Sequence, residues 1–342
     1  MIRIQQLKMP LSHKREDIIK KAAKRCKIKP EQILNLEIVR RSVDARKKSE
    51  VCYVYTVDLT AENEIGILKK VNDKNIMLTN RKKYQFPKAE VSQKETKYRP
   101  VIIGAGPAGL FCTYELTKAG YAPILLERGK RVEERTEDVK RFWESGVLDT
   151  GSNVQFGEGG AGTFSDGKLN TGTRDRRHRW ILEQLVACGA PESILTDAKP
   201  HVGTDMLHVT LVNLRRQLLS LGAQVRFGHR VTGLRVRDGA LEGLEVTGPE
   251  GPYVLPARHA VLALGHSARD TFEMLHAAGV QMEQKPFAIG ARIEHPQSLI
   301  DRGQYGPAAG HPALPPAEYK LNVPTPDKRG VYTFCMCPGG RV

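Results

Sequence analysis

A glycine-rich turn near residue 104 is the first feature of the sequence that predicts a binding function. An apolar run at 101–103 leads into the turn, and five of the residues that follow carry the pattern: Gly104, Gly106, Pro107, Ala108 and Gly109. Gly104 would permit a tight strand-to-helix turn, Gly106 would let a pyrophosphate approach the backbone, and Gly109 would let the helix pack on its strand. The helix N-terminus would offer N–H groups and a positive dipole end to phosphates. The pattern therefore predicts dinucleotide binding; the alternative is a purely structural glycine turn.

An acidic residue closes the next apolar run. Glu127 lies 18 residues after Gly109, at the expected tip of the second strand. A carboxylate there can accept hydrogen bonds from a ribose. A protein that binds NADP would carry a basic residue at this position, so Glu127 favours FAD or NAD. The neighbouring Arg128 weakens that distinction.

A second glycine cluster spans 157–162 and runs on through Asp166 and Lys168. Its glycine density exceeds what a surface turn needs, which indicates backbone lying against a ligand with N–H groups turned inward. We expect Gly159, Gly160 and Gly162 to contact the cofactor. The alternative is a mobile glycine loop.

The composition of the 342 residues excludes several classes of protein. No apolar run is long enough to span a membrane, and the N-terminus lacks the pattern of a signal peptide. The six cysteines show neither a disulfide framework nor zinc-ligand spacing. These features predict a cytoplasmic protein without a structural metal.

The net charge of +15 is unevenly distributed. Residues 1–100 hold 25 Lys and Arg against 12 Asp and Glu, whereas the remaining residues hold 28 against 26. A basic N-terminal segment could attract nucleic acid, an anionic membrane or an acidic partner. Solvated lysine-rich helix faces are the alternative, and the commoner case.

The first 95 residues predict a separate, small α+β domain. Alternating and helical patterns predict six elements: a strand at 1–8, a helix capped by Ser12, strands at 33–40 and 51–59 joined as a hairpin, a helix at 61–71 and a strand at 82–88. This β-α-β-β-α-β order is the ferredoxin-like arrangement. A polar linker is expected at 88–100.

Residues 96–342 predict an α/β, Rossmann-type domain with an inserted substrate region. Helices are expected at 107–119, 130–145, 175–188 and 208–221, and three β runs between 224 and 262, beginning with Gln-Val-Arg-Phe, read as a β-meander. The apolar strand that follows ends in Gly265.

Taken together, these motifs resemble the FAD-dependent oxidoreductases of the glutathione-reductase-like, two-dinucleotide-fold superfamily. Three further stretches resemble a bacterial family of FAD-dependent dehydrogenases within it: 159–169, Ala-Arg-Ile-Glu-His-Pro at 291–296, and 332–340. The resemblance implies an FAD cofactor bound by the fingerprint, Glu127, Arg128, the second glycine cluster and Gly265. It says little about the substrate.

Two departures from that family stand out. His266 and Ser267 follow Gly265 where the family has Thr-Gly, and the sequence stops at 339–342, before the Gly-Asp segment with which such proteins contact the flavin ribityl chain. We therefore expect a C-terminally truncated copy. Because no second Gly-x-Gly-x-x-Gly follows residue 170, NAD(P)H could act only as a transiently bound electron donor.

Three residues are candidates for catalysis. Lys168 could stabilise a reduced anionic flavin, with Asp166 beside it, and His266 could donate a proton near neutral pH. The alternatives are an Asp-Gly turn with a solvated lysine, and a surface histidine.

Two weaker signals involve arginines and cysteines. Arg174, Arg176, Arg177 and Arg179 could grip an acidic substrate, but arginines at the start of a helix are more often solvated. Cys335 and Cys337 could be redox-active, but their one-residue spacing favours two buried thiols.

The function expected first is hydride transfer between FAD and a small molecule. One alternative is a flavoprotein that acts on tRNA or another nucleic acid through the basic N-terminal domain. A second is a flavin-binding protein without catalysis. The oligomeric state and the substrate stay open.

Overall fold

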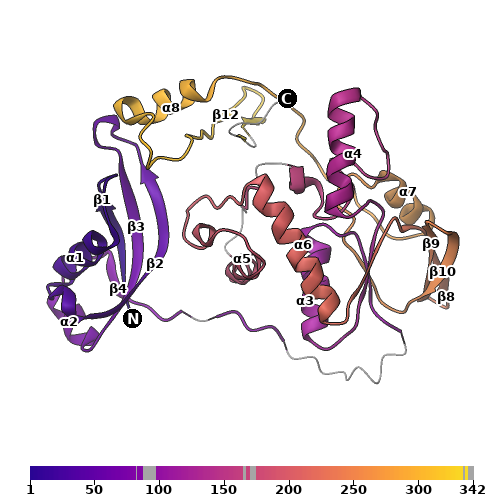
Figure 1. Cartoon of the computed structure of the whole chain (residues 1–342), viewed down its shortest axis with the longest axis horizontal. Helices are drawn as coiled ribbons and strands as arrows, with labels where there is room; N and C mark the ends of the chain where they lie inside the picture. The colour runs from indigo at the N-terminus through magenta and orange to yellow at the C-terminus, as the bar shows by residue number, and fades with distance from the viewer. Residues whose placement is uncertain (82, 88–97, 165–166, 170–174, 334–335, 338–342) are drawn as a thin grey trace.

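The computed structural model describes residues 1–81, 83–87, 98–164, 167–169, 175–333 and 336–337. Two α/β units follow each other along the chain (Figure 1). The segment after the second unit runs back across the top of the view, so that helix α8 (Gln297–Tyr305) lies above the N-terminal sheet. Residues far apart in sequence thus come together near the hairpin that joins β2 (Ile33–Asp44) to β3 (Cys52–Ala61).

The N-terminal unit has the strand order of a ferredoxin-like fold. Its elements are β1 (Ile2–Met9), α1 (Arg15–Cys26), β2 (Ile33–Asp44), β3 (Cys52–Ala61), α2 (Glu64–Lys70) and β4 (Ile76–Leu78). They form an antiparallel sheet in the order β2-β3-β1-β4. Alternate residues of β1 and β3, such as Ile4 and Val57, are fully buried and pack against Ile18 of α1. The fold class expected for this segment is confirmed.

Two local expectations for this unit were wrong. Ser12 does not cap α1; the N-cap is Lys14, whose backbone N–H donates to the Asp17 carboxylate at 2.9 Å. The last strand lies at 76–78 rather than 82–88, because the buried Ile76 pairs with Ile4 of β1. Three residues are too few for a visible alternation. Of the expected linker, 88–97 lie outside the described residues.

The second unit is built on a parallel sheet in the order β11-β5-β6-β7. Its strands are β5 (Val101–Ile103), β6 (Ile124–Glu127), β7 (Gln224–Phe227) and β11 (Ala260–Leu262). Its helices are α3 (Pro107–Lys118), α4 (Val132–Ser145), α5 (Arg177–Ala187), α6 (Thr204–Ser220) and α7 (Arg269–Ala277). β5 and β6 are buried throughout, as strands covered on both faces must be. The unit is the Rossmann-like fold that the sequence predicted.

The meander differs from expectation in its first strand. Gln-Val-Arg-Phe forms β7, which extends the parallel sheet beside β6. The antiparallel sheet consists instead of β8 (Arg230–Arg237), β9 (Ala240–Gly248) and β10 (Gly251–Pro256). Gly228, at φ +73°, makes the turn between β7 and β8. Short strands on either side of such a turn have similar sequence patterns. The strand with which each one pairs decides which sheet it joins.

Short elements complete the chain. Five 3₁₀ turns occur among the described residues, at 30–32, 48–50, 161–164, 192–195 and 306–308, and a small hairpin joins β12 (Asn322–Pro324) to β13 (Gly330–Tyr332). None of the helices in the described ranges has both the length and the apolar character needed to cross a membrane.

The two units contact each other through β2. The backbone of Arg41 donates to Thr196 O at 2.7 Å and accepts from Ala198 N–H at 2.8 Å. Its guanidinium meets both carboxylate oxygens of Asp197, at 2.7 and 3.0 Å. A second contact joins the Tyr53 hydroxyl to the carbonyl of Ala313.

Residues 1–95 expressed alone should fold, because their apolar core is almost wholly made within the unit. The expected result is a dispersed amide NMR spectrum. A collapsed spectrum would show that the contacts with Asp197 and Ala313 are needed for folding and that the domain boundary is wrong.

Candidate functional site

The fingerprint turn lies at the carboxyl end of β5. Gly104 has φ +106°, and a Cβ there would lie 2.3 Å from the carbonyl oxygen of Ala263. A Cβ on Gly109 would lie 1.8 Å from the carbonyl oxygen of Gly104. The chain itself therefore requires these two glycines, for the turn and for helix packing.

Gly106 has no such requirement within the chain. Its φ of −74° suits any residue, and a Cβ would meet nothing closer than the Cα of Gly160, at 3.8 Å. Gly106 is also the N-cap of α3, whose next residues are Pro107 and Ala108. A glycine that the protein does not need for itself fits a ligand approaching the helix N-terminus, where a pyrophosphate is most stable.

Glu127 is buried at the end of β6, with 5% of its surface exposed. One carboxylate oxygen accepts from Ala105 N–H at 2.7 Å; the other accepts from Gly129 N–H at 2.9 Å and Gly157 N–H at 3.0 Å. The carboxylate thus ties the fingerprint turn to the second glycine cluster. Its predicted role in binding a ribose stays a prediction.

The second glycine cluster lies directly on the fingerprint turn. Gly159 N–H donates to Ala105 O at 2.8 Å, and a Cβ on Gly160 would lie 3.1 Å from the Cα of Gly106. A Cβ on Gly162 would meet nothing within 4 Å. Close approach between two loops explains part of the glycine density, and the structure brings the predicted cofactor residues of both loops together.

Arg135 of α4 holds this cluster in place, and the sequence analysis missed it. Its guanidinium is fully buried and its pKa is lowered by burial to about 10. It donates to five oxygens of the loop: the carbonyls of Asn153 (2.8 Å), Val154 (3.1 Å), Glu158 (2.6 Å) and Gly160 (2.9 Å) and the hydroxyl of Thr163 (3.2 Å). The available signal was an arginine on the same helix face as the buried Val132 and Val139.

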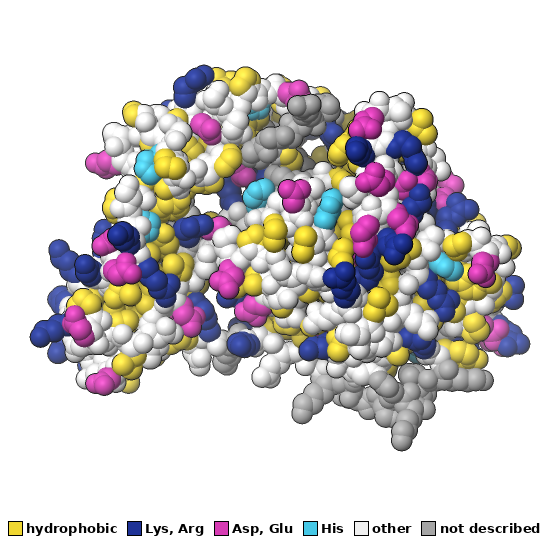
Figure 2. Space-filling model, in the orientation of Figure 1, with side chains coloured by type: hydrophobic (Ala, Val, Ile, Leu, Met, Phe, Trp, Pro, Cys, Tyr) yellow, Lys and Arg dark blue, Asp and Glu magenta, His cyan; other side chains and the backbone are white. Residues whose placement is uncertain are grey.

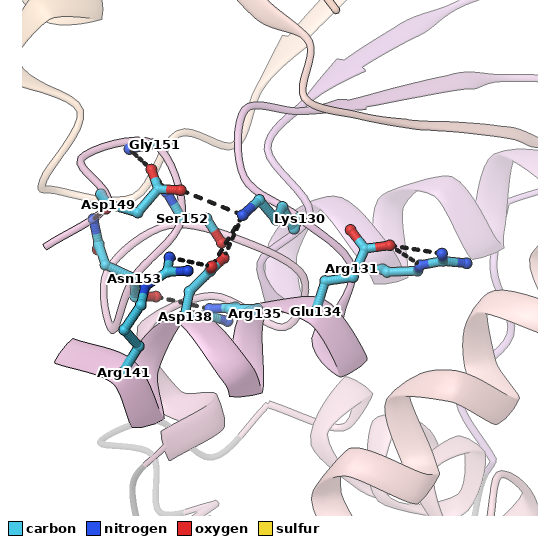
Figure 3. Close-up of polar contacts among 10 residues, drawn as sticks. All are labelled: Lys130, Arg131, Glu134, Arg135, Asp138, Arg141, Asp149, Gly151, Ser152 and Asn153. Carbon is cyan, nitrogen blue, oxygen red and sulfur yellow. Dashed lines mark hydrogen bonds and ion pairs between the residues drawn. The ribbon is translucent and has the colours of Figure 1, made fainter. Parts of the chain in front are cut away.

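Ion pairs around Arg135 fix the loop that precedes the cluster (Figure 3). Lys130 Nζ lies 2.8 Å from the Asp138 carboxylate and 3.3 Å from that of Asp149. Asp149 also accepts from Gly151 N–H at 2.9 Å, and Arg141 pairs with Asp138 at 2.8 Å. The loop after α4 is therefore fastened to that helix before it reaches the glycines.

Glu158 lies inside the second cluster and is fully buried. It accepts from Val132 N–H at 2.8 Å and pairs with Arg215 of α6 at 2.5 Å. Burial raises the pKa of Glu158 to about 7, against the opposing effects of Val132 and Arg215. The side chain links α4, α6 and the glycine loop.

A cavity of about 360 Å³ opens at the carboxyl edge of the parallel sheet. Its lining residues are Arg128, Gln155, Phe156, His266, Ser267, Arg269 and Asp270. The Arg128 guanidinium lies 4.5 Å from the centre of the Phe156 ring and 2.9 Å from Asp270. Gly265, at φ +69°, turns the chain from β11 towards this cavity. Arg128 and His266 thus share one site.

Lys168 lies in a different group of residues. It pairs with His201 in an antiparallel bridge, and its ammonium lies 3.5 Å from Glu318. Asp166, the third catalytic candidate, is outside the described residues. The structure brings Lys168 and His266 into separate clusters, so their catalytic roles stay predictions.

The weaker sequence signals are only partly visible. Arg177 pairs with Asp175 at 2.6 Å and Arg179 with Glu183 at 2.9 Å, while Arg176 is exposed. Cys337 is exposed, which contradicts the expectation of a buried thiol. Arg174 and Cys335 fall outside the described residues.

Comparisons with known families match three segments of the chain. Residues 102–159 match an NAD(P)-binding Rossmann-like domain, residues 286–342 match the family described as FAD-dependent protein, C-terminal domain-like, and residues 1–60 match a domain of unknown function. Two of these matches relate segments of the chain to dinucleotide-binding and FAD-dependent proteins. FAD is the cofactor that this relationship supports, as expected from the sequence.

Two relatives match different shares of the chain. An uncharacterized protein of Clostridium beijerinckii is 43% identical over all 342 residues, which span 63% of that relative. An anhydrotetracycline monooxygenase of Streptomyces rimosus is 30% identical over 48% of the chain and 30% of its own length. The chain thus spans less than two thirds of either relative.

Solved structures show partial likeness. The chain aligns with THI4 of Thermovibrio ammonificans at 18% identity and a TM-score of 0.37, over 54% of this chain and 64% of that one. It aligns with OxyS anhydrotetracycline hydroxylase of Streptomyces rimosus at 26% identity and a TM-score of 0.31, over 49% and 31%.

Arg135→Met should destabilise this FAD-binding unit strongly. The change leaves buried carbonyls without donors, and each such group costs about 1–3 kcal/mol. We expect the free energy of unfolding in urea to fall by about 3 kcal/mol or more. The matched control is Arg131→Met, because Arg131 lies four residues earlier, is 54% exposed and pairs with the exposed Glu134. Its loss should cost about 1 kcal/mol at most; equal losses in the two variants would contradict the role assigned to Arg135.

Proposed function

We propose that this chain belongs to an FAD-dependent oxidoreductase that transfers a hydride between FAD and a small molecule in the cytoplasm. The observation that carries the proposal is the open backbone at Gly106, faced by Gly160 at the N-terminus of α3. Related dinucleotide folds place a pyrophosphate at this point. FAD, when bound, supplies the hydride chemistry itself.

The chain's own residues would then orient the cofactor. The fingerprint turn, with the second glycine cluster packed against it, would bind the pyrophosphate at the N-terminus of α3. Arg128, whose guanidinium lies over Phe156, would border the dinucleotide with His266 at the neighbouring carboxyl end of β11. This arrangement is compatible with the glutathione-reductase-like superfamily and with the monooxygenase relatives alike. The named Streptomyces relative suggests that the substrate is a small molecule.

The test is flavin content in a version extended to the length of the Clostridium relative. The protein should be yellow, release FAD on denaturation, and show reduction of its flavin by NAD(P)H or substrate in stopped flow. Gly106→Val should abolish FAD binding and leave the apo protein folded, since the new Cβ would lie at ordinary contact distance, 3.8 Å, from the Cα of Gly160. Gly104→Val should instead disrupt the fold. Unchanged flavin content in Gly106→Val would show that the cofactor sits elsewhere, and FAD that no donor reduces would favour a non-catalytic flavin-binding protein.

A second candidate function rests on the basic N-terminal unit. Six lysines on or beside α1 are exposed: Lys14, Lys20, Lys21, Lys24, Lys27 and Lys29. Dark-blue side chains mark this outer surface at the left of Figure 2. A flavoprotein that modifies tRNA could use such a surface to hold its substrate.

We expect only weak, nonspecific binding of RNA or DNA, because contacts with phosphates release counterions and so weaken steeply as salt rises. In a filter-binding salt series with tRNA, binding should be lost near physiological ionic strength. Retention of tRNA at that salt, together with its flavin-dependent modification, would place the nucleic-acid function first.

A further inference from the structure

An antiparallel bridge, called the ribbon below, pairs 167–169 with 200–202 and follows the second glycine cluster in the sequence. Leu169 N–H donates to Pro200 O and Val202 N–H to Gly167 O, both at 3.0 Å, and Lys168 lies opposite His201. Residues directly opposite in an antiparallel pair share a face, so Lys168 and His201 lie side by side. Lys199 lies in the bend just before the ribbon, and its ammonium reaches the same carboxylate as that of Lys168.

One carboxylate lies between these two lysines. The Glu318 oxygens lie 3.5 Å from Lys168 Nζ and 3.0 Å from Lys199 Nζ. The Lys168 side chain is 15% exposed, that of Glu318 21% and that of Lys199 61%. Partial burial would raise the pKa of Glu318, but the two ammonium groups lower it overall. The site already receives a carboxylate as an ion.

Glu318 comes from a segment with its own anchor. The preceding residue, Ala317, is buried; its N–H donates to Asp301 at 2.8 Å, and its carbonyl accepts from Gln297 at 2.9 Å. Both partners belong to α8. Glu318 is thus presented to the ribbon from outside by a separate element, and its side chain can turn away without disturbing the ribbon's own hydrogen bonds.

We propose that Lys168 and Lys199 form the site for a carboxylate group of the substrate, and that Glu318 occupies this site in the absence of substrate. The inference rests on the proposed function, because it concerns the substrate of the flavoprotein proposed above, and Lys168 follows the second glycine cluster by only six residues. The ion pair of the exposed Lys199 with Glu318 adds little to stability, whereas two ammonium groups give a small carboxylate strong, charge-assisted hydrogen bonds. The substrate class is therefore a small organic acid.

The experiment measures binding of radiolabelled benzoate and acetate to the FAD-loaded, extended protein by equilibrium dialysis, with benzamide and acetamide as neutral counterparts. Carboxylates should bind and their amides should not. Lys168→Met and Lys199→Met should each weaken binding about tenfold, the equivalent of one charge-assisted hydrogen bond. Glu318→Gln should tighten binding about tenfold, because it removes the internal competitor. The exposed Lys320→Met is the matched control and should change nothing.

The change in carboxylate affinity in Glu318→Gln distinguishes a carboxylate-binding site from a simple clasp, that is, an ion pair that only fastens one segment to another. A clasp that only fastens the C-terminal segment predicts unchanged or weaker binding of carboxylates in Glu318→Gln, and that result would overturn the proposal. Failure of both carboxylates to bind, or equal binding of the amides, would overturn it too. Thermal unfolding of each variant shows whether it is folded. A protein that binds FAD but no carboxylate refutes this inference alone, whereas a protein without FAD refutes the proposed function.

Discussion

The site depends on one buried guanidinium. Arg135 extends from α4 into the loop at 153–163. Its guanidinium donates hydrogen bonds to four carbonyls and one hydroxyl of that loop. A loop so rich in glycine pays a large conformational entropy on ordering. A rigid fork of N–H donors offsets this cost at a single point. Gly157 follows from the same constraint, because a Cβ there would lie 2.4 Å from Arg135 Cδ.

Glu127 and Glu158 extend that constraint to the sheet and to α6. Glu127 accepts hydrogen bonds from backbone N–H groups of the fingerprint turn, of the chain after β6 and of the second cluster. Glu158 links α4 to Arg215 of α6. Both carboxylates bind backbone N–H groups that point inward. These carboxylates hold the backbone around Gly106 and Gly160 from the interior of the unit. The outer side of that surface is consequently open to a ligand.

The sequence could predict the elements whose signal is local. The helix at 107–118, the strands at 101–103 and 124–127 and the ferredoxin-like order all follow from periodicity and turn residues. It could not show that Gln224–Phe227 joins the parallel sheet, because sheet membership depends on a distant partner. Nor could it show that Arg135 lies inside the protein: charge predicts exposure, and only the loop carbonyls make its burial favourable. Glu127 was found by its position, but its three amide partners come from tertiary structure.

The N-terminal unit contacts the unit that carries the site through its edge strand β2. Arg41 pairs with Thr196 and Ala198 through its backbone and with Asp197 through its guanidinium. This pairing covers part of the outer strand β2, which would otherwise present unpaired N–H and carbonyl groups. It also fixes the chain immediately before Lys199 and His201. The basic unit thus supports the ribbon that follows the glycine cluster in the sequence, a structural role that does not depend on its lysine-rich surface.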